Sequence, residues 1–237
     1  MMKKIALLLA GTLINVSFAQ LSFDRSRVIF DAGKKSSQSV VVTNSNAEAP
    51  YLANAWIEND RGEKIVSPLV ALPILQRINP KQDKQIKISF MGSDAELAKD
   101  RETMLFMNVL GVPPKDNDDT NKINIVIQSK MKLFYRPKGL PTYEHNGWFE
   151  EVVAKKAGNS ITLENPTPYY TVIYALTDSR NRTIEKEINL KPFSSETVNI
   201  QVGNKFTMML IDDYGGSVKM NYACNGNVCT GARNEEN

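Results

Sequence analysis

Few residues of this sequence could take part in covalent or metal chemistry, and the two cysteines come first among them. Cys224 and Cys229 are the only cysteines of the 237-residue chain, and they stand close together near its C-terminus. A zinc site needs about four ligands, and the chain adds one histidine, His145, to the two thiols. A disulfide is the ordinary state of such a pair in an exported protein. We therefore expect a disulfide, which mainly pins the end of the last strand because its loop is short.

No motif in the sequence indicates an enzyme. His145 stands beside a proline-rich segment, where a lone histidine is more often exposed or structural than catalytic. No Ser-His-Asp arrangement and no phosphate-binding glycine loop stands out. Asp116, Asp118 and Asp119 could suggest calcium, but the EF-hand spacing and its closing glutamate are absent, which favours a solvated loop. The sequence predicts no catalytic residue, no metal, no cofactor and no use of ATP.

Two pairs of alternating basic residues flank apolar stretches. Arg25 and Arg27 precede Val28, and Lys130 and Lys132 lie within a long apolar segment. Charges in such positions usually lie on a solvated face of a strand. If one lysine and one arginine converged in a cleft, they would form a charge-assisted clamp for a carboxylate. Spacing alone does not decide between these two interpretations.

The segment 123–135 is about twice as long as an average strand. Its first part alternates Ile123, Ile125 and Ile127 with Asn124 and Val126. At the edge of a sheet, such a strand would invite another strand to pair with it, and a protein keeps such an edge when pairing is its task. In the centre of a sheet, the isoleucines would simply fill the core. The pattern leaves both positions open.

The N-terminal residues 1–19 have the composition of a secretory signal peptide. Lys3 and Lys4 precede an apolar stretch, and Ser17 and Ala19 supply the small residues of a cleavage site. The apolar stretch is shorter than the roughly 20 residues that span a bilayer. Removal would leave 218 residues (237 − 19), with 27 basic (29 − 2) against 26 acidic ones. This balance predicts neither nucleic acid nor an anionic membrane as a partner, and no other segment could enter a bilayer.

Alternating apolar and polar residues predict strands throughout the rest of the chain. A single short helix is expected over 94–100. A proline- and glycine-rich break, PKGLP at 137–141, ends the first group of strands and suits a domain junction. Seven strands are predicted before the break, at 23–30, 38–43, 51–57, 70–76, 86–90, 103–112 and 123–135. Seven more follow it, at 148–154, 160–164, 169–178, 183–190, 197–202, 206–212 and 217–224.

Seven short strands in roughly 100 residues is the strand count of an immunoglobulin-like sandwich, and it occurs twice here. The predicted fold is therefore all-β, with two immunoglobulin-like seven-stranded β-sandwich domains. We place the N-terminal domain at 20–138 and the C-terminal domain at 139–237. A single large β domain is the alternative that the pattern leaves open.

Several segments together resemble the periplasmic pilus (fimbrial) assembly chaperone family. The most specific is LAKDRETMLFMNVLGVPP at 97–114, which fits the signature of the family almost position by position. The others are PYLANAWIEN at 50–59, KLFYRP at 132–137, ENPTPYY at 164–170 and DYGG at 213–216. The resemblance covers essentially the whole chain after residue 19. It implies two immunoglobulin-like domains in a boomerang arrangement, with the binding cleft between them.

This resemblance also implies a function and a set of site residues. A periplasmic chaperone of this family binds pilin subunits by donor-strand complementation and delivers them to an outer-membrane usher. Matched by motif, Arg27 and Lys132 would hold the C-terminal carboxylate of the pilin, and Ile123, Ile125 and Ile127 would fill its groove. Lys132 is an odd number of residues away from each of the isoleucines, so simple alternation would place it on the opposite face of the strand. We therefore expect a bulge or a strong twist between Ile127 and Lys132.

A charged trio, Glu102, Arg136 and Asp213, matches residues that bridge the two domains in the family, and we expect it to fix the interdomain angle. A structural pilin or adhesin is the competing interpretation. Such a protein would carry a donor extension at its own N-terminus, and 20–30 is too short to donate a strand and also belong to its own domain.

Overall fold

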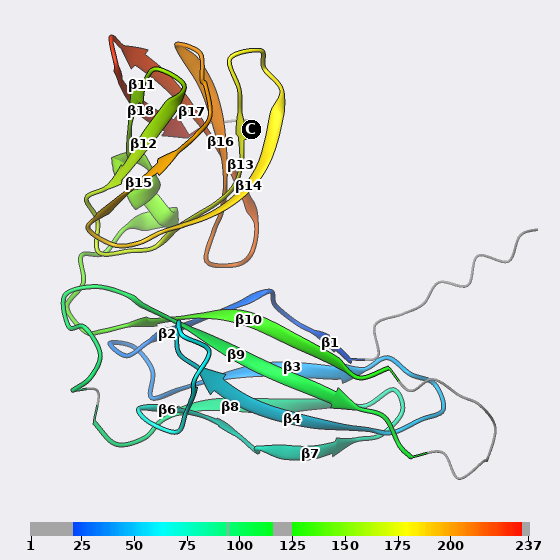
Figure 1. Cartoon of the computed structure of the whole chain (residues 1–237). Helices are drawn as coiled ribbons and strands as arrows, with labels where there is room; N and C mark the ends of the chain where they lie inside the picture. Colours follow the sequence, from blue (N-terminus) through cyan, green and yellow to red (C-terminus); the bar gives the residue numbers. More distant parts are fainter. Residues whose placement is uncertain (1–20, 94, 116–124, 234–237) are drawn as a thin grey trace, which may run out of the picture.

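The structure is a computed structural model that describes residues 21–93, 95–115 and 125–233. It consists of two β-rich domains, which confirms the predicted fold class. Figure 1 shows that the C-terminal domain stands at one end of the N-terminal domain, above β2 and β10, so that the molecule is bent. No helix of the described residues is long and apolar enough to cross a bilayer. The predicted signal peptide at 1–19 lies outside the described residues.

The N-terminal domain is a sandwich of two sheets around one apolar core. The four-stranded sheet has the order β1-β3-β8-β6, formed by β1 (Leu21–Phe23), β3 (Ser37–Asn44), β8 (Asp83–Phe90) and β6 (Leu69–Leu72). The six-stranded sheet has the order β2-β10-β9-β4-β5, with β7 also paired to β4. Its strands are β2 (Arg27–Asp31), β10 (Ile127–Arg136), β9 (Thr103–Val112), β4 (Tyr51–Glu58), β5 (Lys64–Ile65) and β7 (Leu75–Ile78). Alternate residues of the longer strands, such as Val40 and Val42 of β3, are fully buried between the sheets.

Two of the predicted strands are divided between the sheets, and β5 is a short strand that was not predicted, so that the domain has ten strands instead of seven. The segment 23–30 contributes β1 to one sheet and β2 to the other. The segment 70–76 is divided at Pro73, which lacks an N–H for a ladder, so that β6 pairs with β8 and β7 with β4. A chain that changes sheets in this way closes the corner of the sandwich. Turns and bends occupy 95–100, where a helix was expected, and Asp94 lies outside the described residues.

The C-terminal domain curls one continuous eight-stranded sheet around a second core. Figure 1 shows β13, β14 and β16 on one side of this domain and β11, β12 and β15 on the other. The strand order is β14-β13-β16-β17-β18-β11-β12-β15, formed by β11 (Val153–Ala157), β12 (Ser160–Asn165), β13 (Thr171–Thr177), β14 (Thr183–Leu190), β15 (Ser194–Val198), β16 (Lys205–Ile211), β17 (Ser217–Asn225) and β18 (Val228–Arg233).

The strand predicted at 148–154 is wrong over most of its length. A 3-10 segment, η1 (Glu144–Glu151), occupies it, and β11 begins only at Val153. Trp148 and Phe149 are neighbours in sequence and both buried, whereas adjacent residues of a strand point to opposite faces. Trp148 stacks on Tyr169 with their ring centroids 4.5 Å apart. Core packing at the end of the sandwich therefore overrides the local preference of these residues for a strand.

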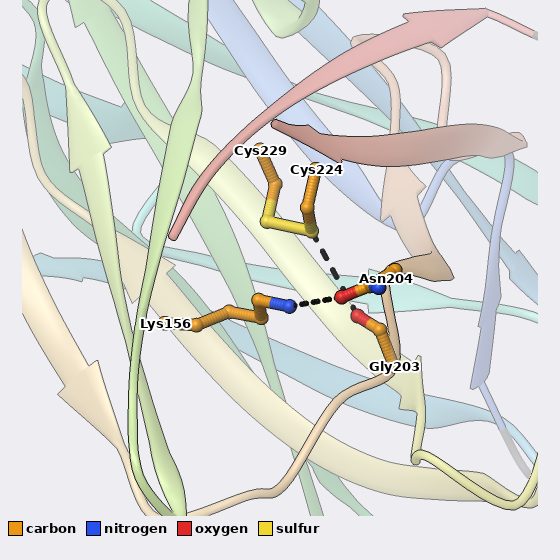
Figure 2. The surroundings of a disulfide bond; sticks show 5 residues. All are labelled: Lys156, Gly203, Asn204, Cys224 and Cys229. Atoms are coloured by element: carbon orange, nitrogen blue, oxygen red, sulfur yellow. Dashed lines mark hydrogen bonds between the residues drawn. A yellow bond between two sulfur atoms is a disulfide. The ribbon is translucent and has the colours of Figure 1, made fainter. Parts of the chain in front are cut away.

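The cysteine pair forms the predicted disulfide, and the bond joins two paired strands instead of only following the last one. Cys224 and Cys229 are opposite residues in the ladder of β17 and β18, and β18 is a strand that the sequence pattern missed. Figure 2 shows the bond close to Gly203, whose carbonyl oxygen lies 3.7 Å from the Cys224 Sγ atom. The disulfide thus joins the last hairpin of the C-terminal sheet at its turn.

Replacing both cysteines by alanine is expected to lower the free energy of unfolding by about 2 kcal/mol, the contribution of so short a loop in the chain-entropy description. The hairpin ladder would remain, so the domain should still fold. Urea unfolding of the double variant and of the wild type, with and without reductant, measures the difference. A reductant effect that persists in the Cys224→Ala/Cys229→Ala variant would contradict the prediction.

Candidate functional site

Strand β10 has a neighbour on both sides along only half of its length. On one side, β9 pairs with it from Ile127 to Tyr135. On the other side, β2 runs parallel to it and pairs only from Lys132 to Arg136. Within the described part of the chain, no strand pairs with 127–131 on the β2 side. Here β10 is an edge strand whose backbone groups can accept another strand.

The two faces of β10 have different surroundings. Met131, Leu133 and Tyr135 point into the core of the N-terminal domain, where all three are buried. The alternation of a strand places Ile127 on the same face, but it lies beyond the end of the core and is 43% exposed. Ile125, in the same alternation, is 60% exposed. The core face of β10 therefore continues, past Ser129, to the exposed Ile127 beside the free edge, with the exposed Ile125 just before the strand.

Two details of the predicted long strand differ in the structure. The strand begins at Ile127 rather than at Ile123, and Ile123 lies outside the described residues. The ladder between β10 and β9 runs residue by residue from Ile127 to Tyr135 without a shift, so the expected bulge is absent. Lys132 simply lies on the outer face. No bulge is needed, because the apolar row and the basic residue occupy opposite faces of one regular strand.

Arg27 and Lys132 are brought together by the parallel pairing of β2 and β10. They are direct partners in the ladder, so their side chains leave the same face of the sheet. The Arg27 Nη1 atom donates a hydrogen bond to the carbonyl oxygen of Ile211 in the C-terminal domain, at 3.3 Å. The Lys132 Nζ atom lies 2.5 Å from Oε1 of Glu187, on β14. The two cations therefore lie at the junction of the domains, at the end of the free edge of β10.

Arg27 is a buried cation whose hydrogen-bonding capacity is only partly used. The residue is 7% exposed, and its Nε atom is buried without a partner. Burial lowers the pKa of its guanidinium, and the nearby carboxylates of Asp213, Asp212 and Glu187 oppose this effect. An arginine remains protonated in proteins. Arg27 thus presents a partly desolvated positive charge with one unused donor, which suits a carboxylate.

The other two basic residues of the alternating pairs have carboxylate partners within the N-terminal domain. Arg25 forms an ion pair with its neighbour Asp24 at 2.5 Å. Lys130 forms an ion pair with Glu58 at 2.9 Å and lies over the ring of Phe106. The fold thus places Arg27 and Lys132 side by side at the domain junction, whereas Arg25 and Lys130 are each paired with a carboxylate elsewhere.

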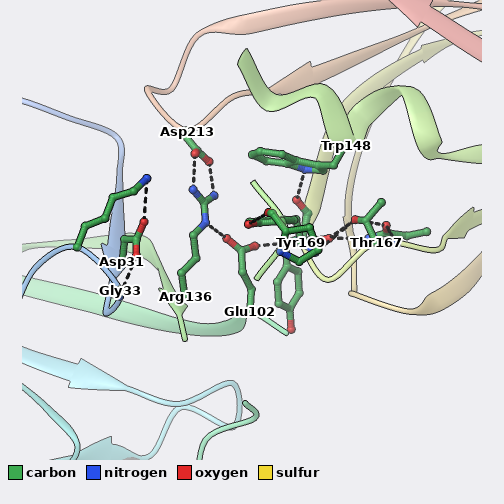
Figure 3. A network of polar contacts seen from close by, with 12 residues as sticks. Asp31, Gly33, Glu102, Arg136, Trp148, Thr167, Tyr169 and Asp213 are labelled. Atoms are coloured by element: carbon green, nitrogen blue, oxygen red, sulfur yellow. Dashed lines mark hydrogen bonds and ion pairs between the residues drawn. The ribbon is translucent and has the colours of Figure 1, made fainter. Parts of the chain in front are cut away.

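Glu102, Arg136 and Asp213 form one network across the domain junction, which Figure 3 shows from close by. The Arg136 Nε atom donates to Glu102 at 2.5 Å, and its two terminal nitrogens donate to the two carboxylate oxygens of Asp213, each at 2.7 Å. The second oxygen of Glu102 accepts a hydrogen bond from the backbone N–H of Tyr170 at 2.7 Å. One arginine of β10 therefore contacts a carboxylate of each domain.

The charges of this network are strongly desolvated. The side chain of Glu102 is 1% exposed and that of Arg136 is 14% exposed. Burial raises the pKa of Glu102 to about 7, against the opposing effects of Arg136 and the Tyr170 N–H. Burial lowers the pKa of Arg136, but the carboxylates of Glu102 and Asp213 outweigh it, so that this pKa is raised overall. Arg136 is thus a permanent charge whose partners cannot be replaced by water.

Sequence reasoning missed Glu187 and the Ile211 carbonyl, which contact the two cleft cations. Glu187 is one of several charged residues on an exposed strand, and nothing in its sequence context distinguishes it from Glu185. In the described part of the chain, no group of three or more His, Cys, Asp or Glu side chains is arranged to hold a metal ion. His145 contributes its backbone carbonyl, which accepts a hydrogen bond from Arg233. The arrangement is suited to binding a strand with a terminal carboxylate.

Two family models match this chain in succession. Residues 20–141 match the N-terminal domain of the PapD pili and flagellar-assembly chaperones, and residues 147–222 match the C-terminal domain of the PapD pili assembly chaperones. Together the two matches cover most of the sequence. Each falls on one of the two β domains.

Individual relatives agree with this match along nearly the whole chain. The chaperone protein PapD of Escherichia coli is 35% identical over 236 residues, which cover 97% of this chain and 98% of PapD. The chaperone protein PmfD of Proteus mirabilis is 36% identical and covers 94% of this chain and 90% of PmfD. The crystal structure of the periplasmic chaperone SfaE is 27% identical, with a TM-score of 0.72 over 86% of this chain and all of SfaE.

Proposed function

This chain belongs to the PapD family of pili assembly chaperones, and from this premise we propose that its free β10 edge and its Arg27–Lys132 pair together bind pilin subunits. The binding is stoichiometric and non-enzymatic, and it takes place in the periplasm after removal of 1–19. The bound subunit is then delivered to an outer-membrane usher. No cofactor takes part and ATP is not used.

The observation that carries this proposal is that the core face of β10 leads, past Ser129, to an exposed apolar residue, Ile127, beside the free edge of the strand. A pilin that lacks the last strand of its own sandwich exposes a groove between its sheets. A strand that lies in this groove must offer free backbone groups on its edge and apolar side chains on alternate positions. Ile127 meets both requirements, because it lies beside the unpaired edge and on the face of β10 that carries Met131 and Leu133. Ile125, two residues earlier and also exposed, is the next apolar side chain at the same spacing. Ile123 would continue this row.

The position of the two cations sets the direction and register of the bound strand. β10 runs from Ile127 toward Lys132, and Arg27 begins β2 beside Lys132. A pilin whose C-terminal carboxylate is held by Arg27 and Lys132 must therefore end where β2 begins, and its last strand must run parallel to β10. Anchoring the terminus matters because a slip of one residue would turn every side chain to the opposite face.

The charged trio has a supporting role in this proposal. Arg136 contacts Glu102 in the N-terminal domain and Asp213 in the C-terminal domain. Asp213 lies in the turn of the β16–β17 hairpin, shortly after Ile211, whose carbonyl oxygen accepts the hydrogen bond from Arg27. By fixing the hairpin, the trio keeps the walls of the cleft at the separation that a strand terminus requires.

Replacing either cleft cation by alanine is expected to reduce pilin capture about tenfold or more, because the carboxylate then loses a partly buried, charge-assisted partner. The measurement is co-purification from the periplasm with candidate pilins encoded beside the chaperone gene, comparing Arg27→Ala and Lys132→Ala with wild type. Arg25→Ala and Lys130→Ala are matched controls, since they remove the same residue types two positions away and should retain capture.

The outcomes of this experiment separate the parts of the proposal. If Arg27→Ala and Lys132→Ala bind the subunit as well as wild type, the cations do not anchor the carboxylate. If wild type captures no pilin but catalyses a reaction or polymerises, the chain does not act as a pilin chaperone. Thermal unfolding of each variant checks that loss of capture does not result from loss of the fold.

A further inference from the structure

Glu187 occupies the position at Lys132 that the proposed function reserves for the subunit. Its Oε1 atom lies 2.5 Å from the Lys132 Nζ atom and accepts a second hydrogen bond, from Asn189 Nδ2, at 3.1 Å. The hydrogen bond from Lys132 is the main reason that the pKa of Glu187 lies below its usual value, and Asn189 and Arg27 act in the same direction. Glu187 is therefore a carboxylate at neutral pH, bound where a second carboxylate is expected.

Arg27 and Lys132, the two cations of the cleft, differ in the charge of their hydrogen-bond partners. Arg27 has a neutral carbonyl partner and a buried Nε atom without any partner. Lys132 has a full negative counter-charge from Glu187. At Arg27 an entering carboxylate competes only with a neutral carbonyl. To take the Lys132 donor that Glu187 holds, however, it must replace Glu187.

Glu187 is placed so that this replacement is easy. It lies on β14, the edge strand of the C-terminal sheet, and its side chain is 59% exposed, whereas that of Lys132 is 19% exposed. A glutamate with so much exposure can turn into water and regain its hydration. The half-buried ammonium of Lys132 cannot do the same, and leaving it without a counter-charge is costly. One carboxylate is thus exchanged for another at an otherwise shielded cation.

We propose that Glu187 is a displaceable counter-ion of the carboxylate anchor, a positioning residue that limits how tightly the cleft holds a pilin terminus. This inference rests on the proposed function, and it deepens the description of the same site. When a subunit enters, its terminal carboxylate displaces Glu187 from Lys132. When the subunit leaves, Glu187 pairs with Lys132 again and offsets the loss of the subunit carboxylate, which makes release easier.

The test uses a synthetic peptide that copies the C-terminal strand of a pilin, made with either a free carboxylate or a carboxamide at its end. Calorimetry gives the dissociation constants of both peptides for wild type, Glu187→Gln and Glu185→Gln. Glu187→Gln is expected to bind the carboxylate peptide about two- to fivefold more tightly, the factor that corresponds to an exposed ion pair. Its affinity for the carboxamide peptide should stay unchanged, because that peptide cannot replace Glu187.

Glu185→Gln is the matched control for the long-range electrostatic effect of removing one negative charge from this strand. Glu185 lies on the same strand, two residues away, and is exposed. It should leave both dissociation constants unchanged. Glu187→Ala, which also removes the hydrogen bonds of a glutamine amide, should shift the carboxylate peptide in the same direction as Glu187→Gln.

The possible failures are distinguishable. If wild type prefers the carboxylate peptide but Glu187→Gln binds it with equal or lower affinity, Glu187 is not a competitor and the inference is wrong while the anchor stands. If Glu185→Gln tightens binding as much as Glu187→Gln, general charge explains the effect, and the inference is again wrong. If wild type binds both peptides equally, the anchor itself is wrong, and the inference falls with it.

Discussion

Replacing Ile127 by aspartate is expected to abolish pilin capture, with a loss of affinity of at least about a hundredfold. Ile127 lies on the apolar face of β10 beside its free edge, and in the proposed complex it enters the core of the pilin. A carboxylate at that position would be buried without a partner. Co-purification from the periplasm, followed by titration of the purified subunit into the chaperone, measures the loss.

Val126→Asp is the matched control for this prediction. Val126 is the preceding residue and is exposed to a similar extent, 49% against 43% for Ile127. In an extended strand its side chain points away from the face that carries Ile127. The same charge at Val126 should therefore reach solvent and reduce capture much less. Equal losses for the two variants would show that alternation does not govern binding, and would contradict strand donation in this register.

The second large effect is expected from Arg136→Met, which should lower the free energy of unfolding by about 3–5 kcal/mol. The substitution keeps much of the side-chain length but leaves Glu102 buried with only the Tyr170 N–H as a partner. Asp213 is less affected, because its side chain is 23% exposed. Urea unfolding followed by tryptophan fluorescence suits this measurement, since Trp148 lies 5.3 Å from the Arg136 guanidinium.

A double variant distinguishes the free-energy cost of leaving Glu102 charged and unpaired from the cost of losing the contacts of Arg136. Arg136→Met combined with Glu102→Gln removes both charges, so that no carboxylate remains buried and unpaired. This variant should recover most of the stability lost by Arg136→Met alone. A double variant that is less stable than Arg136→Met would mean that the contacts, and not the uncompensated charge, dominate the effect.

In this architecture, one strand both exposes apolar side chains to the pilin and carries a residue that anchors the pilin terminus. The same strand, β10, carries the apolar row, Lys132 of the anchor and Arg136 of the trio. A regular strand keeps these groups at fixed separations of about 3.3 Å per residue along its axis. The distance between the groove and the anchored terminus is therefore set by the strand itself, and the C-terminal domain supplies the opposite wall.

Much of the fold could be predicted from local patterns. The alternation at Val40 and Val42 or at Ile86 and Ile88 reflects a half-buried strand, which has the same period in every sheet. Prolines and glycines at 137–141 interrupt any ladder, because a proline lacks the donor that a ladder needs. The disulfide followed from two nearby cysteines with no partner for zinc. These features depend on neighbours along the chain and are visible without the tertiary structure.

Some local signals were overruled by packing. Trp148 and Phe149 favour a strand, but both side chains are buried on one side of a 3-10 segment at the end of the sandwich. The strand β18 was missed because Gly231 and Ala232 have little strand character. It forms because β17 and β11 lie on either side of it and satisfy its backbone. In both places, the surroundings rather than the segment choose the conformation.

The sequence by itself determined the all-β class, because this depends on residues that are adjacent or alternate in the chain, and on the same basis it predicted the junction at 137–141 and the row of isoleucines. The tertiary structure alone decided which basic residues meet. Arg27 and Lys132 converge because two distant segments pair in parallel, whereas Arg25 pairs with its neighbour Asp24 and Lys130 with Glu58 of the same domain. The tertiary structure also leaves the first half of β10 paired with β9 alone and brings the Glu187 carboxylate into contact with the Lys132 ammonium. These relations join segments far apart in the chain, and no local pattern of residue types encodes which distant segments will lie side by side.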